Sequence, residues 1–298
     1  MAKTAACEEF EAACVGAGLK PEIAFIGGGN MATALIEGFL KSGLVTQDSI
    51  FISVLTNESA AHWRKFGITT YTDNDELLDH HGQGLVFLAV KPHMLSTVAL
   101  SIKRRLSRLK VTVSVLAGVR LSSLALCLAA NDGTLCPLIR IMPNMPSAVG
   151  HGAAVLTASA DCPQPMVELV TKLMQTVGTC DAIPESQMDA ACALSGSGPA
   201  FVYSVIEAMS DGGVHAGLPR ALATKLAAQT VMGAAHMVLT TEKHPGELKD
   251  MVCSPGGTTI AGIRALERGN LRSSLIEAVQ AAAERSIQLG NLSQPATK

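Results

Sequence analysis

Ile23-Ala24-Phe25-Ile26-Gly27-Gly28-Gly29-Asn30-Met31-Ala32 is the stretch of sequence that decides the fold. The apolar run Ile23–Ile26 predicts a buried strand, and the spacing of apolar residues in Asn30–Lys41 predicts a helix. The turn between them matches G-x-G-x-x-A, in which glycines let backbone N–H groups approach a pyrophosphate at the start of a helix. We therefore expect dinucleotide contacts at Gly27, Gly28, Gly29, Asn30 and Met31, with a purely structural turn as the alternative.

The sequence after this turn alternates short apolar runs with amphipathic stretches. Strands are expected at Ile50–Leu55, Leu85–Val90, Val111–Leu116, Ile139–Met142 and Ala153–Leu156, and helices at Glu58–Phe66 and Met166–Thr176. Strands that are apolar throughout and separated by helices are typical of a parallel sheet covered on both faces. We therefore predict an α/β fold in which residues 21–182 form a Rossmann-type doubly wound parallel sheet.

The strand signals stop after Ile183, and the rest of the chain is predicted to be helical. The expected helices are Pro199–Gly217, Pro219–Thr241, Thr258–Arg268 and Leu271–Leu289. The second of these carries apolar residues almost all round, at Leu222, Leu226, Val231, Met232 and Met237. A helix of that kind needs burial, and a small domain has little interior of its own. Residues 183–298 are therefore expected to be an all-α domain that binds substrate and forms dimers.

Residues 1–20 precede the first predicted strand and contain Glu8, Glu9 and Glu11, whereas the first arginine is Arg64. Transit peptides are rich in arginine and poor in acidic residues, and secretory signals begin with basic residues. We therefore expect a disordered extension on a cytoplasmic protein. The eight cysteines are scattered without C-x-x-C spacing, which favours free thiols in a reducing compartment.

The composition excludes several classes of partner. The formal net charge is -2 and the pI is near 6.4, so the chain as a whole is not basic. This argues against binding to nucleic acid or to an anionic membrane. No run reaches the roughly 18 apolar residues of a membrane span. The histidines, among them His80, His81 and His93, have no spacing typical of a metal site.

The ends of the predicted strands indicate how a cofactor is chosen and held. Enzymes that use NAD usually place an acidic residue after the second strand to bind the ribose 2′-OH. This chain has Ser53-Val54-Leu55-Thr56-Asn57, which favours NADPH, although Glu58 leaves NADH open. Further candidate cofactor residues lie where the predicted strands end. They are Asn57 after the second strand and, after the later strands, Val90, Lys91, Pro92, Ala117, Gly118 and Asn144.

Two glycine–proline segments interrupt the helical half, at Leu194–Pro199 and at Cys253–Thr259. In the second, Pro255-Gly256-Gly257 holds an irregular loop, and Thr258 and Thr259 open a helix. Free N–H groups and hydroxyls at a helix start form a small anion pocket without a charged residue. A substrate carboxylate is the expected guest. A helix–helix turn capped by threonine is the structural alternative.

From Ile23 to Leu289 the chain resembles the pyrroline-5-carboxylate reductases. The resemblance is most specific in a series of segments in the helical half, which are Leu194–Pro199, Asp211–Val214, Gly217–Arg220, His244–Gly246 and Ser254–Thr259. It implies a Rossmann domain, a helical dimerisation domain and dimers assembled into a decamer. In that family the active site lies between the cofactor domain of one subunit and the helical domain of a partner.

The resemblance also implies functional residues. Cofactor contacts carry over to Gly28, Asn30, Met31, Asn74, Val90, Lys91 and Ala117, and substrate contacts to Glu185, Ser254, Gly257, Thr258 and Thr259. The segment Ser53–Asn57 departs from the family versions associated with NADPH. Met251 stands where some animal members have an asparagine that contacts the cofactor. The residues before the first strand have no counterpart in the pattern.

The expected reaction is hydride transfer from NADPH, or from NADH, to the imine carbon of 1-pyrroline-5-carboxylate, which gives proline. We expect Thr259 to be the hydroxyl nearest to the substrate, and no side chain in the motifs is an obvious proton donor. Two alternatives stay open. One is another imine or β-hydroxyacid reductase, for which Lys225 would have to be catalytic although its neighbours form no known motif. The other is a cofactor-binding redox sensor without turnover.

Overall fold

The computed structural model of the protein describes residues 4–292, with side chains up to residue 290. Within these residues the strands pair in the order β3-β2-β1-β4-β5-β6-β7-β8. Their bounds are β1 Ile23–Ile26, β2 Ile50–Ser53, β3 Thr69–Tyr71, β4 Leu85–Leu88, β5 Thr112–Ser114, β6 Leu138–Met142, β7 Gly152–Ala158 and β8 Gly178–Ala182. The order reverses beside β1, as in a Rossmann fold, so the predicted fold class is confirmed.

Two strands, β7 and β8, depart from the predicted parallel sheet. β7 runs antiparallel to β6, with Ile141 opposite Leu156, and β8 then runs parallel to β7. Only residues 143–151 connect β6 to β7, and a parallel connection needs a crossover of about a dozen residues or more. The short connection, which contains the 3₁₀ helix η4 (Met145–Val149), therefore reverses the chain direction.

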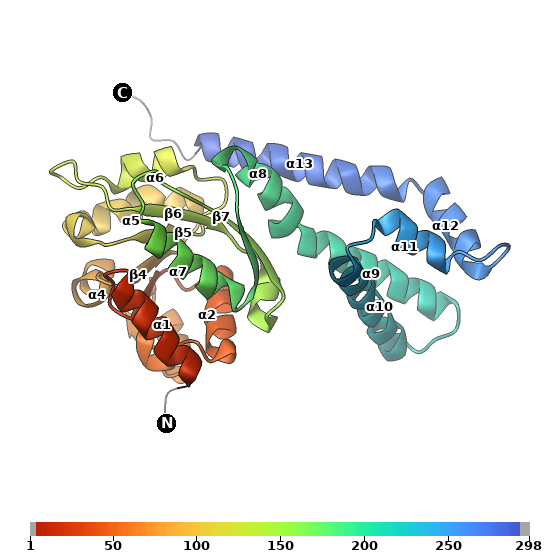
Figure 1. Ribbon diagram of the computed structural model, residues 1–298, viewed down its shortest axis with the longest axis horizontal. Coiled ribbons are helices and arrows are strands. Elements are labelled where there is room, and N and C mark those ends of the chain that lie inside the picture. Colours follow the sequence, from red (N-terminus) through yellow and green to blue (C-terminus); the bar gives the residue numbers. More distant parts are fainter. Residues whose placement is uncertain (1–3, 293–298) are drawn as a thin grey trace. The chain divides into compact units, whose positions relative to one another are not determined.

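Helices cover both faces of the sheet, and each face has its own apolar core (Figure 1). Helices α1 (Ala5–Gly16), α2 (Asn30–Ser42), α3 (Asn57–Lys65) and α7 (Gln164–Gln175) bury residues in one core. Helices α4 (Asn74–His81), α5 (Leu95–Ser101) and α6 (Leu121–Leu128) bury residues in the other. Two-sided burial explains why the central strands β1 and β4 are apolar at every position.

The N-terminal extension is ordered, so the expectation of disorder is wrong for residues 4–20, while residues 1–3 lie outside the described part. Helix α1 begins at the cap Thr4, whose side chain accepts from the Cys7 N–H at 3.2 Å. Cys7, Phe10 and Cys14 are buried, and α1 packs against α7. The spacing of these residues puts them on one face of the helix, and the acidic residues of the sequence lie between them.

The chain divides into two compact units, residues 1–196 with 282–298, and residues 197–281. The expected boundary at 182/183 is therefore displaced. The segment after β8 contains η5 (Glu185–Gln187), α8 (Met188–Ala191) and a π-helical turn at Cys192–Gly196. Both α8 and the π-helical turn pack against β7, and this contact keeps them with the sheet.

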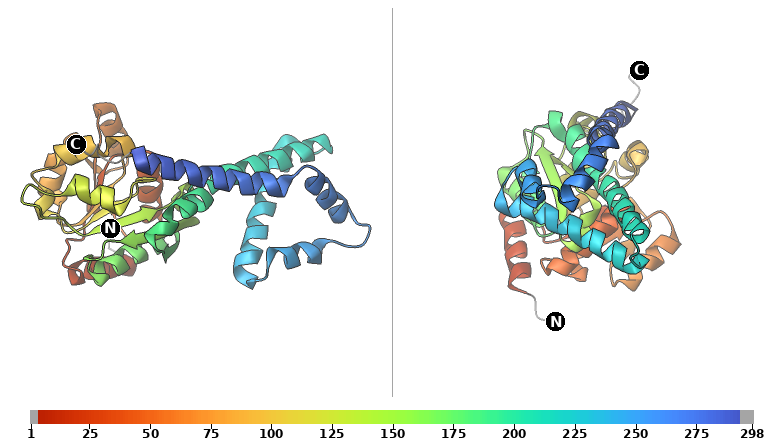
Figure 2. Two further views of the ribbon diagram at one scale, coloured as in Figure 1. Left: turned by 90° about the horizontal axis from the view of Figure 1, so that it is seen from above. Right: turned by 90° about the vertical axis from the view of Figure 1, so that its right-hand side faces the viewer.

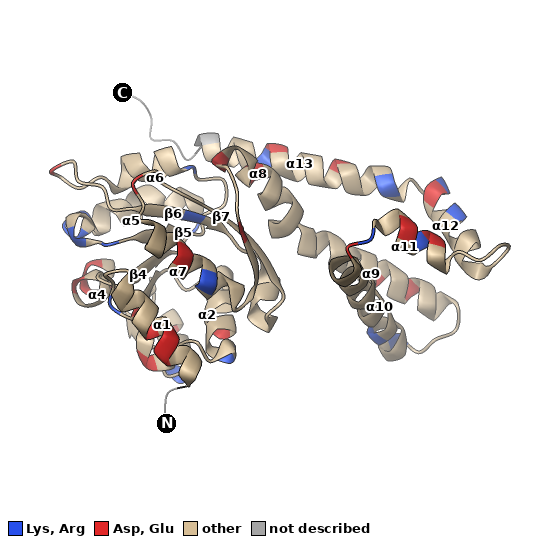
Figure 3. Ribbon diagram, viewed as in Figure 1, with Lys and Arg blue, Asp and Glu red and all other residues tan. Residues whose placement is uncertain are grey.

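The second unit is entirely helical among the described residues (Figure 2). It contains α9 (Gly198–His215), α10 (Arg220–Thr241), α11 (Pro245–Val252), α12 (Thr258–Arg268) and the start of α13 (Leu271–Leu292). Helices α9 and α10 pack against each other. Large apolar side chains on α10 are nevertheless exposed, including Leu222, Leu226 and Met232. The ribbon of α10 carries few charges (Figure 3), and such an apolar surface is typical of a subunit interface.

Candidate functional site

A cleft of about 630 Å³ lies at the carboxyl ends of β1, β2 and β4. It is lined by Gly27–Met31 after β1, by Ser53–Thr56 after β2, and by Ala89–Lys91 after β4. This is the edge of a doubly wound sheet where nucleotides bind, because the strand order reverses there and opens a crevice. The cleft therefore brings together most of the predicted cofactor residues.

The glycine turn is shaped by close packing. Gly27 has φ +101, and an added Cβ would lie 2.7 Å from the Ala89 carbonyl oxygen. At Gly28 an added Cβ would lie 2.5 Å from Trp63 Nε1. At Gly29, the cap of α2, it would meet none of the described atoms within 4 Å. The first two glycines are thus required by the fold, whereas the third leaves open space in the cleft for a ligand.

The N-terminus of α2 can hold an anion. The described side chains provide no cap for this helix, since its cap residue is Gly29. The first N–H groups of a helix have no partner within the helix, and they carry partial positive charge. Asn30 and Met31 are the first residues of α2, and both line the cleft. The turn therefore fits the pyrophosphate of a dinucleotide.

Polar side chains gather where β2 and β3 end. Ser53, Thr72 and Asn74 line the cleft together. Ser53 Oγ donates to Asn74 Oδ1 at 2.6 Å, and Asn74 Nδ2 donates to Ser101 Oγ at 3.0 Å. Asn57 is the first residue of α3 and Glu58 follows it, but neither is among the residues that line the cleft. The β2 end of the cleft lacks a carboxylate among its described lining residues.

The end of β4 supplies Val90 and Lys91 to the cleft, as predicted. Lys91 is the cap of the 3₁₀ helix η2 (Pro92–Met94), and its neighbour Pro92 does not line the cleft. Met94 does so from the same turn, and Met145 of η4 adds an apolar surface. Both methionines were missed in the sequence, because nothing in their local pattern distinguishes them from core residues.

The structure places several predicted cofactor residues elsewhere. Ala117 and Gly118 are not among the residues of the cleft, and Gly118 packs against α13, where an added Cβ would lie 2.9 Å from the Ser286 carbonyl oxygen. Asn144 is 5% exposed. Its Nδ2 donates to the Ser195 carbonyl oxygen at 3.0 Å, and its Oδ1 accepts from the Ala153 N–H at 2.9 Å. Its amide therefore joins two backbone segments, and Asn144 does not line the cleft, so its cofactor contact stays a prediction.

Glu185, a predicted substrate residue, is already engaged by the protein. Its Oε1 accepts from the Leu121 N–H at 2.6 Å and lies 3.2 Å from Nη1 of the buried Arg140. The carboxylate therefore serves as the counter-ion of Arg140. Its expected role in holding substrate stays a prediction.

The Ser254–Thr259 loop lies in the helical unit and has the features expected of an anion pocket. Gly256 has φ +65, and the Gly257 N–H donates to the Ser254 carbonyl oxygen at 3.1 Å. Gly257 is the cap of α12, and no described side chain caps this helix. Thr258 and Thr259 are its first residues, so their N–H groups point out of the helix start. The loop can therefore hold a carboxylate without a charged side chain.

The described part of the chain contains neither a metal-binding cluster nor a membrane span. Within residues 4–290, His, Cys, Asp and Glu form no group of three or more that is suited to a metal ion. No helix among the described residues is long and apolar enough to cross a membrane. All eight cysteines lie among the described residues, and none of them forms a disulfide. Burial raises the pKa of Cys180 to about 12, with Asp181 adding to the effect, so this thiol remains protonated.

Comparison with known proteins follows the same division of the chain. The family model "NADP oxidoreductase coenzyme F420-dependent" matches residues 22–118, and "Pyrroline-5-carboxylate reductase dimerisation" matches residues 185–289. The pyrroline-5-carboxylate reductase of Pisum sativum is 41% identical over 267 residues, covering 90% of this chain and 95% of that protein. The one from Methanosarcina acetivorans is 42% identical over 270 residues, covering 90% and 98%.

Solved structures give the same result. The crystal structure of Plasmodium falciparum pyrroline carboxylate reductase with NADP bound superimposes with a TM-score of 0.80 at 30% identity, covering 90% of this chain and 98% of that one. A pyrroline-5-carboxylate reductase from Coxiella burnetii gives a TM-score of 0.78 at 35% identity, with the same coverage. The similarity thus extends through both units of the chain.

Proposed function

The chain belongs to the pyrroline-5-carboxylate reductase family, and from this premise we propose which of its residues perform the reaction. The activity is the NAD(P)H-dependent reduction of 1-pyrroline-5-carboxylate to L-proline, the last step of proline biosynthesis. It is an oxidoreductase acting on CH–NH groups with NAD(P) as acceptor (EC 1.5.1.2). The proposal concerns the residues, the preferred cofactor and the assembly.

The cleft of the sheet unit holds the dinucleotide. Its glycine turn and the uncapped α2 fit the pyrophosphate, and Gly29 leaves space for it. Lys91 lies in the same cleft and provides a positive charge for a ribose hydroxyl or a phosphate. When bound, the reduced nicotinamide supplies the hydride. The fit supports NADPH in preference to NADH, because no carboxylate lines the β2 end among the described residues.

The loop Ser254–Thr259 holds the carboxylate of the imino acid. The observation that carries this proposal is the uncapped start of α12, where successive N–H groups and the hydroxyls of Ser254, Thr258 and Thr259 are available. These groups accept a carboxylate because a helix N-terminus favours negative charge. Thr259 is only partly exposed, and its hydroxyl is proposed to lie nearest to the substrate.

The protein's contribution to the reaction is positioning. The ring nitrogen of an imine is protonated before hydride arrives, so the product amine forms without a dedicated side-chain acid, and solvent supplies the proton. Holding two reactants in the right geometry lowers a barrier by about 7–11 kcal/mol. The residues proposed above act by holding the two reactants, the dinucleotide by its pyrophosphate and the imino acid by its carboxylate.

A spectrophotometric assay tests the proposed function. Oxidation of NADPH and of NADH is followed at 340 nm with purified protein and 1-pyrroline-5-carboxylate, and reactions without imine serve as controls. We expect oxidation that depends on the imine, with kcat/KM higher for NADPH. Cofactor binding without turnover would contradict the activity, and a higher kcat/KM for NADH would contradict the cofactor preference.

The helical unit carries the dimerisation domain of the family, so the protein forms homo-oligomers. We propose that the dimers assemble further into a decamer. The exposed apolar side chains of α10 support burial against other subunits, because a free apolar surface of this kind is rare on monomers. Light scattering coupled to gel filtration measures the assembly. A mass of about 309 kDa, ten times the chain mass of 30.9 kDa, is expected, and a dimer mass would contradict the decamer.

The cytoplasm is the proposed location. The eight cysteines, all of them among the described residues, form no disulfide, and this supports the proposal because oxidising compartments favour disulfides. Fractionation of the source cells, followed by antibody detection of the protein, tests the proposal. Detection in an organelle fraction instead of the cytosol would contradict it.

A further inference from the structure

The amide of Asn74 is held from both sides at the ribose end of the cleft. Its Oδ1 lies 2.6 Å from Ser53 Oγ, and its Nδ2 lies 3.0 Å from Ser101 Oγ. Asn74 lines the cleft, whereas Ser101 is the last residue of α5 and stands behind it. Ser53 is 1% exposed, so this contact is shielded from water. The two serines therefore restrict how the amide can turn.

The hydrogen bond that Ser101 donates determines the direction of the two bonds made by the Asn74 amide. Ser101 Oγ donates its only proton to the Val98 carbonyl oxygen at 2.8 Å. It must then accept from Asn74, and this requires Nδ2 of Asn74 to face Ser101. The carbonyl Oδ1 consequently faces Ser53, which donates to it. The second proton on Nδ2 is the hydrogen-bond donor that Asn74 has left for a ligand in the cleft.

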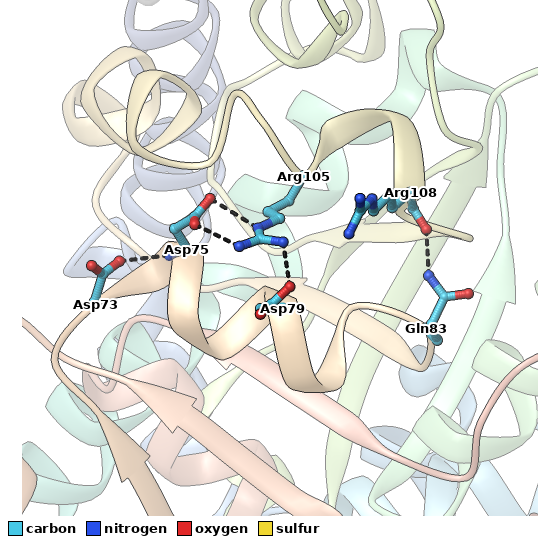
Figure 4. Close-up of polar contacts among 6 residues, drawn as sticks. All are labelled: Asp73, Asp75, Asp79, Gln83, Arg105 and Arg108. Carbon is cyan, nitrogen blue, oxygen red and sulfur yellow. Dashed lines mark hydrogen bonds and ion pairs between the residues drawn. The ribbon is translucent and has the colours of Figure 1, made fainter.

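A salt-bridge clamp fixes the helix that carries Asn74. Arg105 Nε and Nη2 donate to the two carboxylate oxygens of Asp75 at 3.1 and 3.0 Å, and Nη1 binds Asp79 one turn further along α4 (Figure 4). The hydrogen bond from Arg105 lowers the pKa of Asp75, so this carboxylate stays ionised at neutral pH. A bidentate pair constrains geometry more than a single contact does. The start of α4 is therefore held against the segment that contains Ser101.

We propose that Ser101 and Arg105 are positioning residues that orient Asn74 as a hydrogen-bond donor toward the cofactor's ribose 2′ position and thereby favour NADPH over NADH. The 2′ position is expected at this end of the cleft because it lies beside the carboxyl end of β2. A 2′-phosphate carries negatively charged acceptors, and a hydrogen bond to a charged group is stronger than one to a hydroxyl. The proposal rests on the proposed cofactor role of the cleft.

The test measures binding of NADPH and NADH by fluorescence titration, together with kcat and the two cofactor KM values. Ser101→Ala removes the group that orients the amide, and Ser101→Thr keeps a hydroxyl there. Because one hydrogen bond is at stake, we expect Ser101→Ala to reduce the preference for NADPH about three- to tenfold, with kcat at saturating cofactor within about twofold. Ser101→Thr should restore the preference. An unchanged preference in Ser101→Ala would overturn the proposal.

Arg105 has a matched control in Arg108, the last residue of the short 3₁₀ helix η3 (Leu106–Arg108) that Arg105 caps. The contact drawn for Arg108 in Figure 4 uses its backbone oxygen, which accepts from Gln83 at 2.6 Å, and removal of its side chain leaves that atom in place. Arg105→Ala should weaken the NADPH preference, Arg105→Lys should retain part of it, and Arg108→Ala should match the wild type. An equal loss in Arg108→Ala would overturn the role of Arg105.

A last variant replaces the hydrogen-bond donor at position 74 with an acceptor. Asn74→Asp has nearly the same shape, but it presents acceptor oxygens and a negative charge to the cleft. We expect it to bind NADH more tightly than NADPH, and a retained preference for NADPH would contradict a donor role for Asn74. Because binding is measured directly, the outcome does not depend on turnover. Failure of the imine assay would instead contradict the proposed function.

Discussion

Arg140 Nη1 lies 3.2 Å from Glu185 Oε1, and the Arg140 side chain is 1% exposed in the middle of β6. Asp189 is 3.9 Å from Nη2 of the same guanidinium and accepts from Ser286 Oγ at 2.7 Å. The segment after β8 thus supplies both carboxylates beside a buried positive charge, and Ser286 of α13 binds one of them. Oε1 of Glu185 is therefore engaged within the protein by Arg140 and by the Leu121 N–H.

Replacing Glu185 with alanine should lower the free energy of unfolding by about 3 kcal/mol, because it leaves a buried charge without its nearest partner. The KM for the imine should change little. Urea denaturation measures the first effect and the 340 nm assay the second. Glu168→Ala, at an exposed site on α7, is the control and should change stability by less than about 0.5 kcal/mol. A large rise in imine KM with unchanged stability would restore the substrate role of Glu185.

Thr259→Ala should raise the KM for the imine while leaving the KM for NADPH nearly unchanged. The hydroxyl is proposed to contact only the substrate carboxylate, and loss of one hydrogen bond to a charged group costs about 1.5–3 kcal/mol. The imine KM should therefore rise about tenfold or more. Steady-state kinetics with each substrate varied in turn measure both constants. An equal rise in the two KM values would remove Thr259 from the carboxylate site.

Gly28→Ala and Gly29→Ala should differ, although the residues are neighbours in the same turn. A Cβ at Gly28 would overlap Trp63 and Val54, so this variant should lose about 1–3 kcal/mol of stability without cofactor. A Cβ at Gly29 meets open space among the described atoms, so that variant should fold normally and bind cofactor weakly. Thermal melting and NADPH titration separate the two effects. Equal melting temperatures for the two variants would show that the overlap is relieved.

Phe10→Ala should destabilise the sheet unit by about 3–5 kcal/mol, because its ring is 4% exposed and belongs to the core. Val15→Ala, also on α1, is the matched control, since Val15 is 68% exposed. Urea denaturation of both variants gives the comparison. Similar small effects in the two would indicate that α1 contributes little to the stability of the fold.

Stability should decrease as the pH falls below about 6.5, through His81. Its ring stacks on Phe51, with Nε2 3.0 Å from the Tyr71 hydroxyl and Nδ1 3.3 Å from Glu22. Burial lowers the pKa of His81 from 6.5, and Glu22 opposes this only in part. The unfolded chain therefore binds the proton first, so protonation favours unfolding below the unfolded-state pKa.

The pH dependence of this site is checked by thermal melting between pH 5.5 and 7.5. His81→Asn should flatten the dependence, whereas His80→Asn, which leaves His81 in place, should not. An unchanged pH dependence in His81→Asn would assign the effect to other groups. Tyr71 should keep its proton throughout this range, since burial raises its pKa above the ordinary value of 10.0.

Local patterns predicted elements of both candidate sites. β1 has the predicted bounds Ile23–Ile26, and α12 has the predicted bounds Thr258–Arg268. Glycine turns, caps and apolar periodicity act between neighbouring residues, and the sequence displays them directly. Helix α1 was missed because its apolar stripe consists of few residues among several acidic ones. The direction of β7 was missed because the spacing of apolar residues and the composition of a segment do not indicate in which direction a strand runs.

The sequence by itself determined the fold class, the glycine turn, the family and the loop Ser254–Thr259, since each depends on residues that are adjacent in the chain. Tertiary structure alone decided which polar side chains remain available. Asn144 is engaged by Ser195, 51 residues away, and Glu185 by Arg140, 45 residues away. Asn74 is oriented by Ser101 across 27 residues. A buried polar group must find a partner wherever the fold brings one, and no local pattern in the chain specifies that partner.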